Sequence, residues 1–283
     1  MACGRSTTRR AEWHLRRVSC RPGLDPGPIP RAALLCLALW AAPTHAAPCD
    51  KPVYLTFDTG HMAVAPLIAD VLNRHHVKVT FFAAQERTKE GDGSLGEHWA
   101  AWWRARAAEG HEFASHTYDH TYWRADLPGG RFRVRASAGP DAGKDKVWTT
   151  AQYCAEIGKA AQRLEQVTGK KPLPLFRAPG GKTSPKLLAA AESCGYKHVG
   201  WSPAGFLGDE LPSDAASNPQ LLAKALRDIR PGDILLAHLG IWSRKEPWAP
   251  AVLEPLVTGL QAKGFCFATL RDHPAYRQWI ATH

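Results

Sequence analysis

A regular alternation of short β-rich runs with segments of helical periodicity constrains the fold of this 283-residue chain more than any other feature. The β-rich runs are residues 53–57, 77–82, 111–115, 173–176, 197–201, 233–237 and 265–270. Strands that alternate with helices form a parallel sheet with right-handed crossover connections. The sequence therefore predicts an α/β protein, either an imperfect (β/α) barrel or a doubly wound sheet. Its ligands should bind at the carboxyl ends of the strands.

Each run except the last is followed by a pattern typical of a helix. The expected helices are residues 65–74, 97–109, 150–168, 185–194, 219–229 and 249–263. Ser184 is a suitable N-cap residue, and Gly169 and Gly195 are suitable residues at helix ends. Residues 121–148 interrupt the alternation, because they are rich in Arg, Gly and Pro and show no clear period. We expect an inserted loop there.

Residues 1–46 have the pattern of a leader. The apolar run 32–42 follows Arg31 and precedes Thr44-His45-Ala46, a small-x-small cleavage site. The run is too short to span a bilayer, which needs about 20 residues. We expect a secretory signal peptide, a mature domain over residues 47–283, and export to the periplasm or the cell exterior. The alternatives are a buried helix and an uncleaved anchor, and only the anchor would give the protein a membrane contact.

Composition excludes several classes of protein. With 45% hydrophobic and 22% charged residues, the chain is neither disordered nor a coiled coil. The formal net charge is +10, but half of it lies in the leader. The remaining charge is too small to indicate a nucleic-acid partner.

Four cysteines lie beyond the leader, at positions 49, 154, 194 and 266, and they allow three pairings. No CxxC spacing suggests a structural zinc site. Because disulfides form in oxidising compartments, we expect two of them, Cys49–Cys266 and Cys154–Cys194. Four buried free thiols are the alternative.

Polar residues follow four of the expected strands at their carboxyl ends. Asp58 follows the first strand, His116 and His120 follow the third, Arg177 follows the fourth and His238 follows the sixth. The carboxyl ends of parallel strands meet at one rim, so we expect these five side chains to converge. Each residue alone would more often be a surface ion pair or a satisfied core group.

The residue types suit metal-assisted hydrolysis. His116 and His120 are four residues apart, one helical turn, so both imidazoles could face one metal ion. Asp58 could be a ligand or a general base, and Arg177 could keep a carboxylate ionised. His238 follows an apolar run that would hold it rigidly, and it could donate a proton to a leaving group.

Four short motifs, in order along the chain, resemble those of the polysaccharide deacetylase family, also called the NodB-homology domain or carbohydrate esterase family 4. They are Thr56-Phe57-Asp58-Thr59-Gly60, His116-Thr117-Tyr118-Asp119-His120, Arg177-Ala178-Pro179-Gly180-Gly181 and Leu236-Ala237-His238. The resemblance covers residues 51–270. It implies a distorted (β/α)7 barrel that removes N-acetyl groups from an amino-sugar polysaccharide.

The resemblance also implies a role for each motif residue. Asp58 would be the general base, with Arg177 orienting it. His116 and His120 would bind a divalent metal, most often zinc. His238 would protonate the departing amine.

Substrate contacts follow from the same resemblance and from the tryptophans. The backbone N–H of Gly180 would help to bind the oxyanion. Trp201 and Trp242 lie near the motif loops and could stack on sugar rings, and Tyr118 of the second motif is a further candidate contact.

The chain departs from the family pattern at two positions. Thr59 replaces an Asp that is normally the third protein ligand of the metal, and water, Thr59 Oγ1 or His61 could fill that place. The fourth motif carries Ala204 where an Asp normally tunes the acid histidine, and Asp209 or Asp214 could substitute for it.

The leading hypothesis is therefore an exported, metal-dependent N-deacetylase acting on peptidoglycan or a chitin-like glycan. The first alternative is a catalytically degenerate domain that binds glycan without chemistry. The second is a hydrolase of a non-sugar amide on the same fold.

Overall fold

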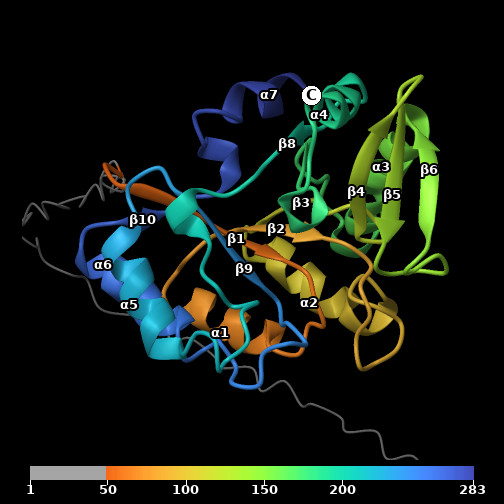
Figure 1. Cartoon of the computed structure of the whole chain (residues 1–283). Coiled ribbons are helices and arrows are strands. Elements are labelled where there is room, and N and C mark those ends of the chain that lie inside the picture. The colour runs from red at the N-terminus through yellow and green to blue at the C-terminus, as the bar shows by residue number, and fades with distance from the viewer. Residues whose placement is uncertain (1–48) are drawn as a thin grey trace, which may run out of the picture. The chain divides into compact units, whose positions relative to one another are not determined.

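Seven parallel strands form the central sheet of residues 49–283, the part of the chain that this computed structural model describes (Figure 1). They are β1 (Pro52–Asp58), β2 (Thr80–Ala83), β3 (Glu112–Ser115), β7 (Leu175–Phe176), β8 (Lys197–His198), β9 (Ile234–His238) and β10 (Cys266–Phe267). The order is β10-β1-β2-β3-β7-β8, and β9 also pairs with β1. The predicted parallel α/β fold is confirmed. The predicted leader and its signal peptide lie outside the described residues.

The sheet curves into a distorted (β/α)7 barrel that does not close. Between β8 and β9 an isolated bridge, Phe206 to Leu236, stands in place of a continuous ladder. Two further hydrogen bonds support it there, from the N–H of Ser202 to the Ile234 carbonyl and from the N–H of Leu207 to the Leu236 carbonyl. The barrel prediction is therefore correct, with an irregular seam beside the strand that ends in His238.

Helices flank the sheet as the periodicity predicts (Figure 1). They are α1 (Ala65–Arg74), α2 (Glu97–Ala108), α3 (Thr150–Thr168), α4 (Pro185–Ser193), α5 (Asn218–Asp228), α6 (Leu253–Ala262) and α7 (Arg277–Thr282), with 3-10 turns at Pro179–Gly181, Pro203–Gly205 and Leu270–Asp272. The Thr149 side chain caps α3 in a capping box with Gln152, and left-handed Gly169 ends that helix. The last long helix begins at Leu253, later than the predicted residue 249.

Alternation along β1 explains which side chains enter the barrel. Val53, Leu55 and Phe57 pack outward into the core formed with the helices. Successive side chains of a strand point to opposite faces, so Thr56 and Asp58 face inward with Tyr54. The strand that begins as core therefore ends with a buried carboxylate directed at the interior.

Residues 121–148 are not an inserted loop, and that prediction was wrong. They form most of a three-stranded antiparallel sheet, β4 (Thr121–Leu127), β5 (Arg131–Ala136) and β6 (Asp145–Thr149). Along β5 every second residue is buried, and Phe132 and Val134 pack with Tyr153 and Ile157 of α3. Because arginines occupy the exposed positions, β5 contains no continuous apolar run, and its strand pattern is easily overlooked.

Both predicted disulfides are present, Cys49–Cys266 and Cys154–Cys194. The first joins the start of the chain before β1 to β10, and the second joins α3 to the end of α4. Among residues 49–283, the structure has no helix with the length and apolar character needed to cross a membrane.

Candidate active site

The carboxylate of Asp58 is held by the guanidinium of Arg177. Arg177 Nη1 donates to Asp58 Oδ1 at 2.6 Å and to Thr56 Oγ1 at 2.9 Å, and its other nitrogens donate to the carbonyls of Val199 and Gly200. Both charged groups are almost completely buried. Burial alone would raise the pKa of Asp58, but the Arg177 charge, with His116 and His238, outweighs it and lowers the pKa. Asp58 is therefore ionised at neutral pH.

His116 and His120 lie together beyond the end of β3, with ring centroids 4.8 Å apart. The segment between them is a turn and not a helix, so the helical-spacing argument was wrong about how the rings meet. Thr117 and His120 have left-handed backbone conformations, with φ of 59° and 49°. Such angles are strained for a β-branched residue. The N–H of Thr121 donates to Thr117 Oγ1 at 2.7 Å, which helps to hold the turn.

His238, at the end of β9, lies between two carboxylates. Its Nδ1 is 3.2 Å from both Asp209 oxygens, its backbone N–H donates to Asp209 Oδ2 at 2.6 Å, and its Nε2 is 3.9 Å from Glu210 Oε2. Burial would lower the pKa of His238, but Asp209, and more weakly Asp58 and Glu210, raise it to about 9. His238 is therefore protonated at neutral pH. Of the two substitutes considered for the Asp missing at Ala204, Asp209 is the one that contacts His238.

A cavity of about 220 Å³ brings the predicted residues together at the carboxyl ends of the strands. Its lining includes Asp58, His116, His120, Gly180, Trp201 and His238. Gly180 has a left-handed conformation, φ 62°, and a Cβ there would lie 3.0 Å from the Tyr122 ring. A Cβ on Gly181 would lie 2.7 Å from the Trp201 ring. The two glycines therefore let both aromatic rings approach the third motif.

Besides Arg177, which contacts Asp58 from behind, three predicted residues lie outside this cavity. Thr59 is buried, and its Oγ1 accepts from the N–H of Ala84 at 3.0 Å. Tyr118 lies against α3, with Lys159 Nζ 3.8 Å from its ring centroid. Trp242 lines a neighbouring cavity instead.

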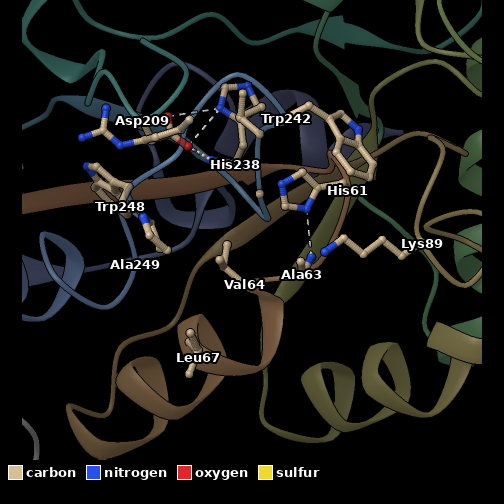
Figure 2. A pocket seen from close by; sticks show the side chains of 14 residues that line it. His61, Ala63, Val64, Leu67, Lys89, Asp209, His238, Trp242, Trp248 and Ala249 are labelled. Atoms are coloured by element: carbon tan, nitrogen blue, oxygen red, sulfur yellow. Dashed lines mark hydrogen bonds and ion pairs between the residues drawn. The ribbon is translucent and has the colours of Figure 1, made fainter. Parts of the chain in front are cut away.

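The neighbouring cavity, about 420 Å³, is drawn in Figure 2 and shares His238 with the first. Trp242 is 59% exposed there, and its ring lies 4.5 Å from that of His61. The wall is largely apolar, with Val64, Leu67 and Ala249 beneath the rings (Figure 2).

Sequence reasoning missed several residues that line the 220 Å³ cavity, among them Glu86, Tyr122, Ser137 and Glu210. Glu86 follows β2, a position that the strand-end rule could have indicated, whereas Glu210 lies in the long loop between β8 and β9, far from a strand end. Tyr122 lies in β4 and Ser137 follows β5, so neither could be placed without the three-stranded sheet. Ser137 Oγ lies 2.5 Å from His120 Nδ1 and fixes that ring.

The two histidines are suited to bind a divalent cation. His116 Nδ1 is 2.9 Å from the Arg177 carbonyl, and His120 Nδ1 is hydrogen-bonded to Ser137. Nε2 of each ring is therefore the nitrogen that can coordinate a cation. Burial lowers the pKa of His116 to about 4, which keeps the imidazole neutral, as a ligand must be. Within residues 49–283, no three His, Cys, Asp or Glu side chains are already gathered in a metal-binding cluster. The residues therefore fit two ligands of a cation.

An ionised carboxylate, a protonated imidazole and two further imidazoles around one cavity suit a hydrolase that works by general acid–base catalysis. A sequence model described as "Polysaccharide deacetylase" matches residues 45–199, more than half of the chain. The chain belongs to the polysaccharide deacetylase family.

Named relatives and a solved structure agree with this family. The chain is similar to a chitooligosaccharide deacetylase of Azorhizobium caulinodans, 27% identical over 231 residues, which cover 78% of this chain and 93% of that protein. It is similar to the peptidoglycan-N-acetylmuramic acid deacetylase PdaA of Bacillus subtilis, 24% identical, covering 79% of this chain and 71% of that protein. A family 4 acetyl xylan esterase from Clostridium thermocellum, solved with a cobalt ion, shares the fold. Its TM-score is 0.60 at 22% identity, over 81% of this chain and 92% of that one.

Proposed function

We propose that this chain is an exported, metal-dependent deacetylase that hydrolyses the N-acetyl groups of an amino-sugar polymer, either peptidoglycan or a chitin-like glycan. The observation that supports this most strongly is the shared cavity. Asp58, His116, His120 and His238 border it, and Arg177 holds Asp58 from behind.

Asp58 is the proposed general base. The Arg177 charge keeps it ionised, and its second oxygen, Oδ2, lies 3.4 Å from His116 Nε2 and faces the cavity. A water molecule there could give its proton to Asp58 while it attacks the acetyl carbon. The carboxylate is anchored through Oδ1 only, which leaves Oδ2 available for that proton.

His238 is the proposed general acid. Asp209 binds Nδ1 and holds the ring in place, so the proton on Nε2 points away from Asp209. A pKa raised to about 9 keeps this proton in place until the sugar amine departs. Acid and base lie on neighbouring strands, since Asp58 pairs with His238 in the β1–β9 register.

His116 and His120 would hold a divalent cation, with zinc as the first candidate. When bound, such an ion polarises the acetyl carbonyl and favours deprotonation of water. The backbone N–H of Gly180 is the proposed second donor to the oxyanion, and Trp201 offers an aromatic face to a sugar ring.

Release of acetate tests the proposal. The purified chain, loaded with zinc or cobalt, should release acetate from chito-oligosaccharide or from peptidoglycan, and a chelator should abolish the release. Asp58→Asn should abolish it too, whereas Asp141→Asn, which changes a half-exposed carboxylate outside the cavity lining, should not. No acetate from either substrate class with either metal would contradict the proposal.

A second candidate function is glycan binding without chemistry. It is supported by Thr59, whose side chain is occupied by the Ala84 N–H and does not border the cavity. Under this alternative, retention on insoluble chitin or peptidoglycan would survive Asp58→Asn combined with His238→Ala, and no acetate would appear with wild type.

Export is supported by the leader pattern and by the two disulfides, which persist in oxidising compartments. Fractionation of cells that express the chain tests it. The protein should be found in the periplasm or the medium, with both disulfides formed and the first residues removed.

A further inference from the structure

We propose that Glu86 supplies the third protein ligand of the metal ion, completing a set of two histidines and one glutamate. The inference rests on the proposed metal-dependent function. Catalytic zinc sites use three protein ligands and keep a fourth position open, and two His with one Glu is an established donor set. Here two imidazoles are in place, and the third donor must come from a side chain that borders the same cavity.

The other candidate ligands near the first motif already make different contacts. Thr59 Oγ1 accepts the Ala84 N–H at 3.0 Å and is fully buried outside the cavity. His61 Nδ1 accepts the Ala63 N–H at 3.1 Å, and its ring lies against Trp242 in the neighbouring cavity. Asp58 is held by Arg177, which leaves it as the base.

Glu86 is placed at the right edge of the barrel. The β1–β2 register sets Asp58 beside Phe82, and the chain then passes through Ala84 and Gln85 to Glu86 at the same carboxyl edge. Glu86 borders the cavity together with both histidines and with Ser137, the residue that binds His120.

The Glu86 carboxylate is free to turn toward an ion. Within residues 49–283 it forms neither a hydrogen bond nor an ion pair with another side chain, and the residue is half-buried. A glutamate has three rotatable side-chain bonds. Rotation about these bonds moves the carboxylate within the cavity without movement of the backbone.

The backbone that carries Glu86 is fixed from several sides. Its N–H donates to Ser94 Oγ at 2.9 Å and its carbonyl accepts from the Ser94 N–H at 2.9 Å. The N–H of Gln85 donates to the Tyr118 carbonyl at 2.6 Å, inside the His116–His120 turn. Thr59 anchors Ala84, two residues before Glu86. Thr59 thus takes the role of positioning the loop that bears the ligand.

Charge supports the same assignment. A dication held by two neutral imidazoles would bring two positive charges to a site where the Asp58 charge is already balanced by Arg177. A carboxylate ligand from Glu86 would offset one of them, and carboxylate oxygens bind Zn²⁺ at about 2.0–2.2 Å. Glu210 also borders the cavity, but it lies on the His238 side, 3.9 Å from that ring.

Zinc affinity of the full chain, stripped of metal and titrated in competition with a chromophoric chelator, tests the inference without reference to activity. Glu86→Gln should weaken Zn²⁺ binding by at least about 10-fold, and Thr59→Asp combined with Glu86→Gln should recover most of that loss. The matched control is Glu90→Gln, which removes the same charge from the same loop but lies outside the cavity. It should bind zinc as wild type does.

The outcomes separate the two proposals. If wild type binds no zinc, the metal-dependent function and the Glu86 assignment both fall. If wild type binds zinc and Glu86→Gln leaves the affinity unchanged, or weakens it no more than Glu90→Gln does, only the Glu86 assignment is wrong. Thr59→Asp alone gives an independent check that does not need Glu86→Gln to fold. It should change zinc affinity less than about 3-fold, and a gain of 10-fold or more would show that the third position had been empty.

Discussion

Replacing Asp209 by Asn should lower the pKa of His238 and move the alkaline limb of the rate profile. Asp209 contributes more than any other group to raising that pKa, through its charge and its contacts of 3.2 Å with Nδ1. Asn keeps the volume and can still accept the His238 backbone N–H. It removes the negative charge, so burial then dominates and favours the neutral imidazole.

The magnitude follows from the two pKa values involved. In wild type, the pKa of about 9 leaves His238 protonated across neutral pH, and activity should fall only as pH rises through about 9. In Asp209→Asn the pKa should fall to the ordinary value of 6.5 or below. At one pH unit above the pKa only about a tenth of the imidazole carries its proton, so the rate at pH 7.5 should drop about 10-fold or more and partly recover at pH 6.

The assay is the pH dependence of kcat for acetate release, together with NMR titration of the His238 ring in metal-free protein. The NMR measurement reports the pKa even if turnover is slow. Asp214→Asn is the matched control, because Asp214 was the other candidate from the same loop and is not a partner of His238 in the structure. An unchanged alkaline limb in Asp209→Asn, or an equal shift in Asp214→Asn, would refute the reasoning.

Three further results are expected. Arg177→Met should lower the free energy of unfolding by about 3–5 kcal/mol in urea titrations, because it leaves the buried Asp58 charge uncompensated; a loss below 1 kcal/mol would contradict this. Replacing Cys154 and Cys194 by Ser opens a link across 40 residues and should cost about 3–4 kcal/mol by the loop-entropy relation, with an unchanged denaturation midpoint as the contrary outcome. Trp201→Ala should raise KM for glycan by about 2- to 12-fold with little change in kcat, as expected for loss of 0.5–1.5 kcal/mol of aromatic contact; a fall in kcat alone would point to another role.

The helices could be predicted because the spacing of their apolar residues in the sequence agrees with the faces that they bury. The helix 150–168 has a capping box at its start and a left-handed glycine at its end, and both are local features of the sequence. Strand starts were less predictable. Val77 and Val79 are buried and apolar, so they resemble a strand, yet β2 begins only at Thr80. Hydrophobicity indicates that a residue is buried, whereas a strand is defined by its backbone hydrogen bonds to a neighbouring strand.

The three-stranded sheet was missed for a related reason. In β5, Arg131, Arg133 and Arg135 alternate with Phe132 and Val134, but neither β4 nor β6 shows the same alternation of buried and exposed residues. The partner strand β6 supplies few apolar residues, and its exposed Val147 breaks the pattern. Pairing between strands supplies the stability here, and a single sequence does not display pairing.

The site was predictable where a parallel sheet dictates it. Asp58 and His238 end adjacent strands in register, so their proximity follows from the strand-end rule. The approach of His116 to His120 follows instead from a left-handed turn that the sequence does not reveal. Glu210 reaches the cavity on a long loop between β8 and β9 that no short motif encodes.

The two departures from the family pattern can be understood together. Thr59 and Ala204 each lack a carboxylate, yet a carboxylate from another position of the same rim stands close to each affected group. For the acid histidine the replacement is Asp209, at 3.2 Å from the His238 ring. For the metal we propose Glu86. A parallel barrel gathers many loops at one edge, so a charge lost from one strand end can be supplied by its neighbour without rebuilding the core. A domain that only binds glycan would need neither replacement, because a ring stacked on an aromatic face requires no protonated imidazole and no ion. The placement of Asp209 therefore favours catalysis over binding alone.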